Sequence, residues 1–447
     1  MPSVDESRGV SESNGSNAVI SDVSRQRIDA RPQRLNTWFN LIPVKKFEDT
    51  QPAKVLFLDS FVTVESRKAT DGTNENSYSV FFEGQHEMSA VVKYGLIFVW
   101  YGDDLLTPDR PFPVIFEKPF TSKYVSSKMS QFEKTHIMDF VENGSDNLHF
   151  ERVHLWDSSK MYDHVISEET ITLSQDAAIN YGASTTNLSG RILSKLIPQL
   201  NLHHDFVYYG PGLATVAATG IGNLNFQSLV SLTPEGEHGT RLYVTIAVDP
   251  ETFPKWAEKA FGWVSPKHAL CDVLASILAN FVQNEFHADA VIWANKRFQN
   301  LNLLPVEKFL DDVRSWGETF YPKDFEPPVV AEKAPGQMQW EYLDDVANIT
   351  QGIVHPYNVS GEALVATQDA QGEIHVFDAY CPHQGAHLAC PGTIDDDRIR
   401  CPFHGFHFDN EGGCLGPSES NRTKVIPGLE MPQIKFRIED GRVEVFV

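Results

Sequence analysis

Four residues near the C-terminus have the types and spacing of metal ligands. They are Cys381 and His383, followed by Cys401 and His404, in the pattern C-x-H-x17-C-x2-H. Each short segment offers one thiolate and one imidazole, a mixture that suits a two-iron cluster with unequal irons. Two thiolates would hold one iron and two neutral imidazoles the other, and replacing thiolates by imidazoles raises the reduction potential. The pattern therefore predicts an electron carrier.

A structural zinc site is the alternative interpretation of this motif. Zinc sites usually pair Cys with Cys and His with His, whereas each half of this motif mixes the two. Each half is also followed by a glycine and a second histidine, and the region resembles the Rieske [2Fe–2S] domain of ferredoxins and oxygenases. The second histidines, His387 and His407, fall outside the ligand spacing and are expected in loops or at the surface. Cys390 and Cys414 are expected to be free thiols.

The composition excludes several classes of protein. The net charge of −23 argues against nucleic acid or an anionic membrane as the main partner. Residues 337–447 alone carry 17 acidic and 7 basic side chains, which would steer a basic redox partner or simply keep the chain soluble. Five cysteines give no disulfide framework, and there is no signal peptide or span of 18 apolar residues, so we expect a cytoplasmic protein.

The chain divides into a tail, three folded pieces and a linker. Short β-like runs fill the first piece, and a long helical pattern from Lys267 to about Asn300 closes the second. Prolines mark the linker, and the third piece is rich in strand patterns. The expected boundaries are 1–34 for a disordered tail, 35–118 and 119–321 for the first two pieces, 322–337 for the linker and 338–447 for the cluster piece.

A second candidate metal site lies in the middle piece. His149, His154 and a nearby carboxylate could form the 2-His-1-carboxylate site of a non-haem Fe(II) protein, which leaves positions open for O2. Asp146 and His149 would share one helical face, but His154 would point away on an ideal helix, so the helix must end or widen by a π-bulge. Taken without the cluster motif, the segment is better explained as a histidine-rich helix with satisfied polar neighbours.

Beside the cluster motif, this segment resembles the N-x2-D-x2-H-x4-H signature of Rieske oxygenase catalytic domains. The resemblance implies that His149 and His154 bind the mononuclear iron, that Asp146 links the two metal centres, and that Asn143 lies near the iron. The family takes its third ligand from a late helix, often in a D-x2-I-W pattern, which Asp289 matches. Glu285, one helical turn earlier, is the rival, and His287 lies between them.

The resemblance also implies a fold and an unusual domain order. We expect an α+β chain in which β-rich Rieske-type domains flank a helix-grip catalytic domain, an antiparallel sheet with helices. The family places its cluster domain first, whereas this chain has its cluster motif last. Runs such as Tyr94–Tyr101 make the first piece resemble a Rieske domain that has lost its cluster. The appended domain could serve the iron of its own chain or of a neighbour, or act as a mobile shuttle on its linker.

The resemblance implies an enzyme that adds oxygen from O2 to a small organic substrate, with monooxygenation expected ahead of demethylation, desaturation or dioxygenation. Its cofactors would be a [2Fe–2S] cluster and a mononuclear Fe(II). No dinucleotide fingerprint follows a strand, so NAD(P)H would act only through a separate reductase. The family works as a head-to-tail homotrimer in which the cluster of one subunit serves the iron of its neighbour. The alternative is an electron-transfer protein whose middle piece only binds a ligand or partner.

Overall fold

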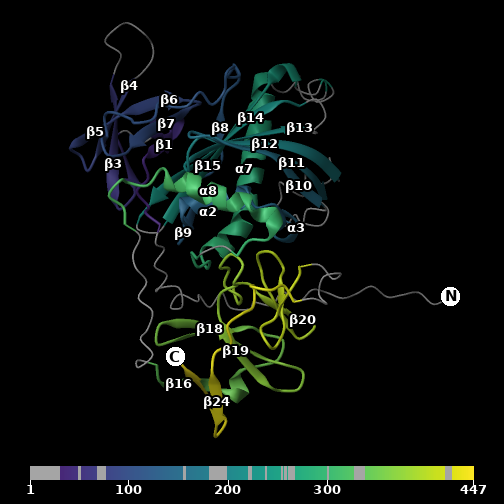
Figure 1. The fold of residues 1–447 in the computed structure, drawn as a ribbon. Coiled ribbons are helices and arrows are strands. Elements are labelled where there is room, and N and C mark those ends of the chain that lie inside the picture. The colour runs from purple at the N-terminus through teal and green to yellow at the C-terminus, as the bar shows by residue number, and fades with distance from the viewer. Residues whose placement is uncertain are drawn as a thin grey trace, which may run out of the picture.

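The computed structural model describes residues 31–48, 52–67, 77–154, 158–180, 199–219, 224–236, 239–252, 255, 259, 267–299, 302–326, 338–417 and 425–447. Its architecture is mixed α+β and rich in strands, as the sequence predicts (Figure 1). An N-terminal β part packs beside a central sheet with helices, and a C-terminal β part lies against the end of the central part. Most of the expected tail and linker, residues 1–30 and 327–337, lies outside the described residues.

Two small antiparallel sheets form the N-terminal part. Their elements are β1 (Thr37–Pro43), α1 (Val44–Glu48), β2 (Ala53–Phe57), β3 (Ser60–Arg67), β4 (Ser77–Phe82), β5 (His86–Met88), β6 (Ala90–Lys93) and β7 (Leu96–Tyr101). One sheet has the order β1-β7-β6 and the other the order β2-β3-β4-β5. The hydrophobic core of this part continues into the central part, where Phe39 and Phe57 belong to the same buried cluster as Val244.

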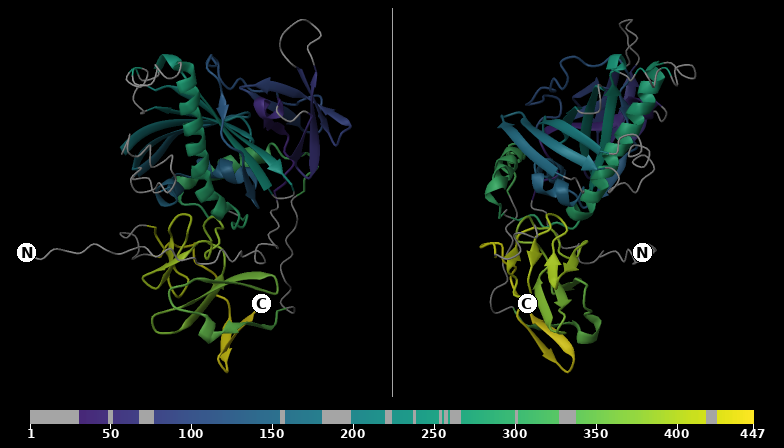
Figure 2. Two further views of the ribbon diagram at one scale, coloured as in Figure 1. Left: turned by 180° about the vertical axis from the view of Figure 1, so that it is seen from behind. Right: turned by 90° about the vertical axis from the view of Figure 1, so that its right-hand side faces the viewer.

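The central part is a large antiparallel sheet with the order β10-β11-β12-β13-β14-β15-β8, and β9 also pairs with β15. Its strands are β8 (Val125–Ser126), β9 (Ser130–Glu133), β10 (Ser158–Ile166), β11 (Ile171–Asn180), β12 (Gln199–Tyr208), β13 (Leu213–Thr219), β14 (Phe226–Glu235) and β15 (Gly239–Val248). A 3-10 turn, η2 (Pro250–Thr252), follows the last long strand. The long helix α7 (Lys267–Trp293) crosses one face of the sheet, as both views of Figure 2 show. It packs on β15.

Helix α7 carries a buried stripe that fixes which of its residues face inward. Cys271, Ala275 and Ala279 are buried at helical spacing, and Asp289 and Trp293 continue the buried face at its C-terminal end. The helix ends seven residues earlier than its sequence pattern predicts. Beyond the end of the helix, the Arg297 backbone N–H donates to Gly385 O of the C-terminal part at 2.7 Å.

Shorter helices cover the end of the sheet that faces the C-terminal part. They are α2 (Ile137–Gly144), α3 (Asn147–Arg152), the 3-10 turn η3 (Pro305–Glu307) and α8 (Phe309–Glu318). The segment that was expected to place Asp146 and His149 on one helix is therefore two helices with a break at Ser145 and Asp146. At the end of α2, Gly144 is required because a Cβ there would collide with the buried Tyr208 hydroxyl of β12.

The C-terminal part contains three small antiparallel sheets. Its elements are β16 (Trp340–Asp345), η5 (Val346–Asn348), β17 (His355–Val359), β18 (Glu362–Gln368), β19 (Ile374–Asp378), β20 (Thr393–Asp395), β21 (Arg398–Arg400), β22 (His407–Phe408), β23 (Cys414–Leu415), β24 (Phe436–Glu439) and β25 (Arg442–Phe446). The sheet orders are β16-β25-β24, β17-β18-β19 and β20-β21-β22-β23.

The N- and C-terminal parts share one strand order. In each, the first strand pairs with the last, and the last pairs with the strand before it, giving β1-β7-β6 and β16-β25-β24. Each first strand leads into a short helical turn, α1 or η5, and then into an antiparallel meander that begins β2-β3-β4 or β17-β18-β19. The sheet β20–β23 has no counterpart in the described segment between β4 and β6, which contains only the short strand β5.

A buried charge network fastens the helices of the central part. The Glu142 carboxylate of α2 pairs with Arg314 at 3.0 Å, with Lys296 at 3.2 Å and with Arg31 at 3.5 Å. Arg31, which the sequence placed in the tail, is buried and also pairs with Asp139 at 2.8 Å. Although burial opposes ionisation, these three cations hold the pKa of Glu142 well below its ordinary value. No helix among the described residues is long and apolar enough to cross a membrane.

Replacing Glu142 tests this network. Glu142→Gln should lower the free energy of unfolding at neutral pH by about 3–5 kcal/mol because three cations lose their buried carboxylate. The folded pKa is depressed, so the stabilisation is present above the unfolded pKa of about 4.3 and fades as the pH falls below it. Denaturant unfolding of wild type and variant should therefore show a smaller difference in the free energy of unfolding in acid than at neutral pH. Glu133→Gln, at an exposed position on β9, is the control, and equal losses in both variants would contradict the assignment.

Candidate functional site

The break between α2 and α3 brings two histidines together. Asp146 is the N-cap of α3, with an extended backbone, and does not share a helical face with His149 as the sequence predicted. Helix α3 ends at Arg152, with the Val153 N–H donating to His149 O at 2.6 Å. The helix therefore ends instead of widening, and the chain turns so that the His149 and His154 rings lie 5.3 Å apart between centroids.

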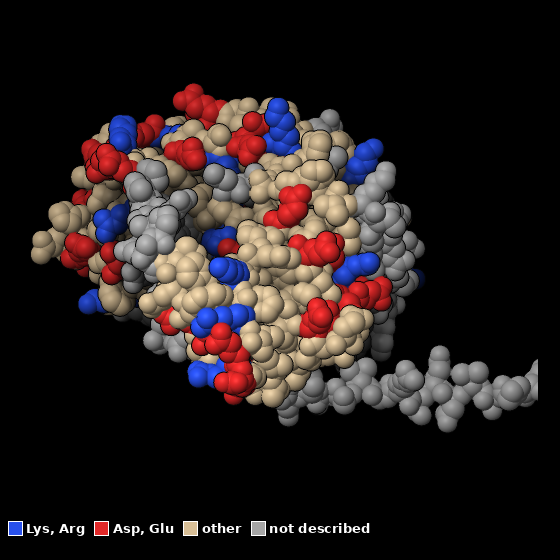
Figure 3. Space-filling model, turned by 60° about the horizontal axis from the view of Figure 1, so that its bottom comes forward, with Lys and Arg blue, Asp and Glu red and all other residues tan. Residues whose placement is uncertain are grey.

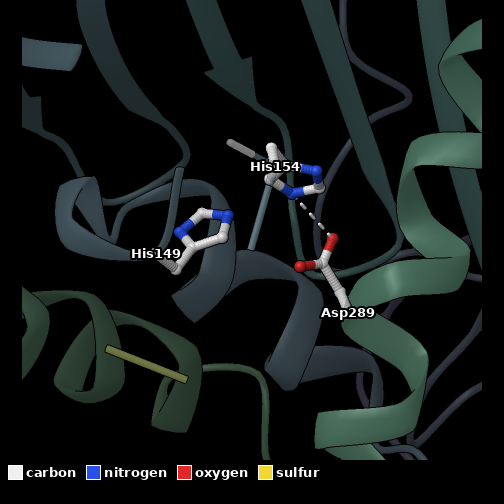
Figure 4. A group of neighbouring side chains, drawn as sticks. All are labelled: His149, His154 and Asp289. Carbon is white, nitrogen blue, oxygen red and sulfur yellow. Dashed lines mark ion pairs between the residues drawn. The ribbon is translucent and has the colours of Figure 1, made fainter. Parts of the chain in front are cut away.

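Asp289 of α7 completes a group of three buried candidate metal ligands. One ligand atom from each of His149, His154 and Asp289 lies within 4.8 Å of the other two. The three side chains converge on one point between α3, the turn after it and α7 (Figure 4). Their exposed fractions are 0%, 7% and 1%, so water does not satisfy them. Two imidazoles and one carboxylate on one side of a metal are the donor set of non-haem Fe(II) sites.

The polar contacts around this group fit a bound cation. Both Asp289 carboxylate oxygens are buried without a hydrogen-bond partner among the described residues, and His154 Nε2 lies 3.2 Å from one of them. A buried carboxylate in that state is strongly disfavoured unless a positive charge faces it. His149 Nδ1 donates to Asp146 O at 2.5 Å, which leaves His149 Nε2, 3.0 Å from Asn143 Nδ2, on the side of the site.

The two rival residues of α7 have other roles. Glu285 lies 3.5 Å from His154 Nδ1, the ring nitrogen that faces away from Asp289, where an orienting carboxylate is usually found in metal sites. His287 Nε2 lies 3.1 Å from Ser130 Oγ of β9. The geometry thus places Asp289 at the candidate site and Glu285 behind one of its histidines.

The two histidines differ in how readily they hold a proton. Burial is the main cause that lowers the pKa of His149 to about 4, so its imidazole is neutral, as a metal ligand must be. Burial also opposes a proton on His154, but Asp289 and Glu285 outweigh it and raise the pKa of His154 to about 10. A metal cation between His154 and Asp289 would supply the positive charge that this proton otherwise provides.

The four candidate cluster ligands lie in two loops of the C-terminal part. Cys381 and His383 follow β19, and Cys401 and His404 connect β21 to β22. The loops have matching geometry: the Gly385 N–H donates to Cys381 O at 2.9 Å. The Gly405 N–H likewise donates to Cys401 O at 3.1 Å. Both glycines have positive φ angles of 77° and 73°, which is why each loop needs glycine after its histidine.

The ligand atoms of the two loops converge as a two-iron cluster requires. His383 Nδ1 and His404 Nδ1 lie 3.1 Å apart, and both rings use Nε2 for hydrogen bonds elsewhere, so both Nδ1 lone pairs face one place. Cys381 and Cys401 are fully buried, and their thiols contact each other. Burial raises the pKa of Cys381, whereas the hydrogen bond from Cys381 overcomes burial and lowers the pKa of Cys401 to about 7.

Two carboxylates of the central part receive the far nitrogens of the cluster histidines. His404 Nε2 donates to Asp146 Oδ2 at 2.5 Å, and His383 Nε2 donates to Glu307 Oε2 at 2.8 Å. Gln384 Nε2 also donates to Asp146 at 3.1 Å. Although burial opposes ionisation, His404 holds the pKa of Asp146 well below its ordinary value. Sequence reasoning found Asp146 through its motif but missed Glu307 and Gln384, which stand in no recognisable pattern.

The neighbouring histidines and cysteines of the loops are structural. His387 and His407 are buried, with exposed fractions of 3% and 0%, so the surface alternative was wrong; His387 lies in the loop between β19 and β20, and His407 begins β22. His387 Nδ1 accepts from the Ala389 N–H at 3.2 Å, and His407 Nε2 donates to Asp395 at 3.0 Å. The five cysteines form no disulfide. Burial is the main cause that raises the pKa of Cys390 to about 11 and that of Cys414 to about 12.

Two family models match this chain. One is described as the Rieske [2Fe-2S] domain and covers residues 339–427. The other is described as the 3-ketosteroid 9alpha-hydroxylase C-terminal domain and covers residues 99–321. The first range contains all four candidate cluster ligands, and the second contains His149, His154 and Asp289.

Several characterised proteins are similar to parts of the chain. The oxygenase component of a 3-ketosteroid-9-alpha-monooxygenase from Mycolicibacterium smegmatis is 40% identical over 84 residues, which is 19% of this chain and 22% of that protein. A cholesterol 7-desaturase from Ciona intestinalis is 37% identical over 103 residues, or 22% of each chain. The similarity thus spans about a fifth of the length of these relatives.

Solved structures give broader but weaker similarity. Dicamba monooxygenase is 14% identical, with a TM-score of 0.38, over 65% of this chain and 97% of that chain. An NdmA variant from Pseudomonas putida with caffeine is 11% identical, with a TM-score of 0.41, over 68% of this chain and 99% of that chain.

Metal analysis of two α7 variants tests the ligand assignment. Wild type should bind three irons per chain, two in the cluster and one mononuclear. Asp289→Ala should retain the two cluster irons and their EPR signal but lose the third, because an alanine offers no ligand. Glu285→Ala, one turn earlier, removes only the carboxylate behind His154, so it should keep both cluster irons and weaken binding of the third iron far less than Asp289→Ala. The opposite pattern, with iron lost only from Glu285→Ala, would show that Glu285 is the ligand.

Proposed function

The chain belongs to the Rieske oxygenase α-subunit family, and on that premise we propose that it is a monooxygenase that hydroxylates a small organic substrate with O2. The observation that carries this proposal is the single carboxylate between the two metal sites. Asp146 bonds through its side chain to the cluster histidine His404 and through its backbone carbonyl to the iron histidine His149. A protein that only carried electrons would have no need of a second buried metal site at the end of this path.

The net reaction consumes R–H, O2, two electrons and two protons and yields R–OH and water. When bound, the cluster supplies single electrons and the mononuclear iron supplies the place where O2 is activated. His149, His154 and Asp289 would occupy one side of the metal and leave the other side for O2 and substrate. Asp146 holds His404 and His149 in fixed orientations, and burial of all these groups keeps water from the path.

The fold supports the finer domain assignment. The central sheet with α7 across one face supports a helix-grip catalytic domain within 119–321. The strand order common to the N- and C-terminal parts supports a Rieske-like domain at 35–118 that has lost its cluster-bearing loops, and a Rieske domain at 338–447. The tail and the linker at 322–337 remain the boundaries proposed from the sequence, although Arg31 belongs to the folded part.

The buried residues on one face of the central sheet support the proposal of a largely apolar substrate. Gln175 of β11 and His204 of β12 lie directly opposite each other, and both are buried. Gln175 is linked to the iron helix, because its Nε2 donates to Ser159 Oγ and that hydroxyl donates to Asn147 of α3. A few buried polar groups on an apolar wall suit a molecule with few polar substituents. Together with the 3-ketosteroid and sterol relatives, this leads us to propose a steroid-sized substrate.

A separate reductase would supply the electrons. Figure 3 shows the face of the molecule that contains the C-terminal part, where acidic and basic side chains are interspersed and no single sign dominates. The net negative charge of this part therefore does not by itself mark where a reductase binds. We propose a reductase that draws electrons from NAD(P)H, with no nicotinamide site on this chain.

Isotope labelling distinguishes hydroxylation from related reactions. The reconstituted protein, a generic reductase and NADH are incubated under ¹⁸O2 with a panel of 3-ketosteroids, sterols and aromatic methyl ethers. We expect one ¹⁸O atom in the product, detected by mass spectrometry. Two labelled atoms would indicate dioxygenation, a loss of two hydrogens without label desaturation, and formaldehyde release demethylation. Absence of any product while the cluster is still reduced and reoxidised would favour an electron-transfer protein.

Replacing Asp146 tests the link between the two centres. Asp146→Asn keeps the shape of the side chain but loses its charge, so its bond to His404 weakens. Product formation should fall by about 10–100-fold, as is usual for groups that orient metal ligands. Reduction of the cluster by dithionite should be unaffected. Asp395→Asn, at the partner of the buried His407, is the control and should retain activity. Equal losses in both variants would indicate a general loss of stability.

A further inference from the structure

The C-terminal part contacts the central part of the same chain over a buried interface. One hydrophobic cluster contains residues of both, because Ile292 of α7, Val153 and Leu304 pack against a group that includes Cys381 and Phe403 of the cluster loops. Both views of Figure 2 place the C-terminal part directly against the helices that carry the candidate iron ligands. Apolar packing shared in this way indicates a fixed contact and not a loose association.

The chain segment that follows α7 grips the first cluster loop through its main chain. We call residues 294–307 the clamp segment; all but 300 and 301 are described. Besides the bond from Arg297 N to Gly385 O, the Asn302 N–H donates to His383 O at 3.1 Å. A Cβ at Gly385 would collide with Arg297 O. The backbone at Gly385 therefore lies so close to the backbone at Arg297 that no side chain would fit between them.

Side chains of the clamp segment also form hydrogen bonds with the first cluster loop. Gln299 Nε2 donates to Cys381 O at 3.1 Å, and Asn302 Nδ2 donates to Pro382 O at 2.8 Å. Arg297 pairs with Asp378 at 3.2 Å, and its guanidinium lies 4.5 Å from the centre of the Tyr380 ring. The clamp segment begins at the end of the helix that holds Asp289, so the first cluster loop is held by the direct continuation of an iron-ligand helix.

Two buried carboxylates make separation of the parts costly. Asp146 and Glu307 have exposed fractions of 1% and 6%, and each bonds a different cluster histidine. The second loop is also enclosed, because a Cβ on Gly405 would lie 3.3 Å from the Arg152 side chain of α3. Undocking would break the charge-assisted hydrogen bonds of both carboxylates to the cluster histidines at once. A domain that shuttled on its linker would not be built this way.

From these contacts we propose that the cluster of each chain delivers its electrons to the iron of the same chain, so that one chain contains a complete electron path. This inference rests on the proposed function. In each transfer one electron leaves the reduced cluster, which is oxidised by one electron, and the iron site is reduced by one. The reductase, a flavin or iron–sulfur protein, then restores the cluster. The family pattern, in which a cluster serves the neighbouring subunit, would not apply to this chain.

Mixing two inactive variants tests the proposal. Asp289→Ala removes the iron site but keeps the cluster, and Cys401→Ser removes the cluster but keeps the iron site. The two are co-expressed with different affinity tags, and any mixed assemblies are purified over both tags. Transfer within a chain predicts no recovery of product formation, or no mixed assembly at all. Recovery toward about a third of wild-type activity, as each mixed head-to-tail trimer has one productive interface of three, would overturn the proposal.

Cross-linking provides a readout that does not depend on turnover. Arg297→Cys and Asp378→Cys are combined in one chain that retains its cluster, and a short bismaleimide is added. The replaced side chains are 43% and 25% exposed, while the five native cysteines are buried. Docking within a chain predicts one cross-linked peptide pair in a product of monomer mass. Covalent oligomers that require both substitutions, or no cross-link between the two sites, would overturn the proposal.

The two kinds of failure are distinguishable. If wild type forms no product from any substrate, the proposed function fails, while the cross-link still reports where the cluster domain docks. If wild type is active and the mixed variants recover activity, the proposed function stands and the proposal of transfer within one chain fails. Each single-cysteine variant, treated with the same reagent, is the control for reaction with a native thiol.

Discussion

A buried carboxylate must find partners, and the position of Asp146 follows from that constraint. Its side chain caps α3 and bonds both His404 and Gln384, while its carbonyl accepts from His149. One residue thus satisfies a helix end, a cluster loop and a metal-site histidine. Because His404, Gln384 and His149 are buried, water does not compete for these bonds, and the relative positions of the two candidate metal sites follow from the geometry of a single residue.

The break between α2 and α3 is what makes this arrangement possible. In a continuous helix, the backbone groups of Asp146 would form helical hydrogen bonds, and His154 would point away from His149. Ending α2 at Gly144, where Tyr208 leaves no room for a side chain, frees Asp146 to act as a cap. The Glu142 network connects α2 to Lys296, just after the end of α7, and to Arg314 within α8, so the three elements that carry or support the site are held together.

Short sequence motifs predicted the candidate ligands. Contacts between residues that lie far apart in the sequence could not be predicted from such motifs. Cys381, His383, Cys401 and His404 are recognisable because a cluster requires close spacing within each loop. Asp289 was distinguished from Glu285 by a short family pattern, and the buried stripe of α7 explains the choice physically. Glu307 bonds a histidine 76 residues away, and only the docking of two parts brings them together. The burial of His387 and His407 likewise depends on packing between loops that sequence spacing does not describe.

The strand order common to the N- and C-terminal parts bears on how such proteins evolve. In the C-terminal part, the loops that carry the candidate ligands extend from the small sheet β20–β23, inserted into a framework of six strands that also exists without it at the N-terminus. A framework that closes without the insertion can lose a metal centre and still fold. At the N-terminus such a framework, without the insertion, shares a hydrophobic core with the central sheet and so supports the sheet that carries the candidate iron site.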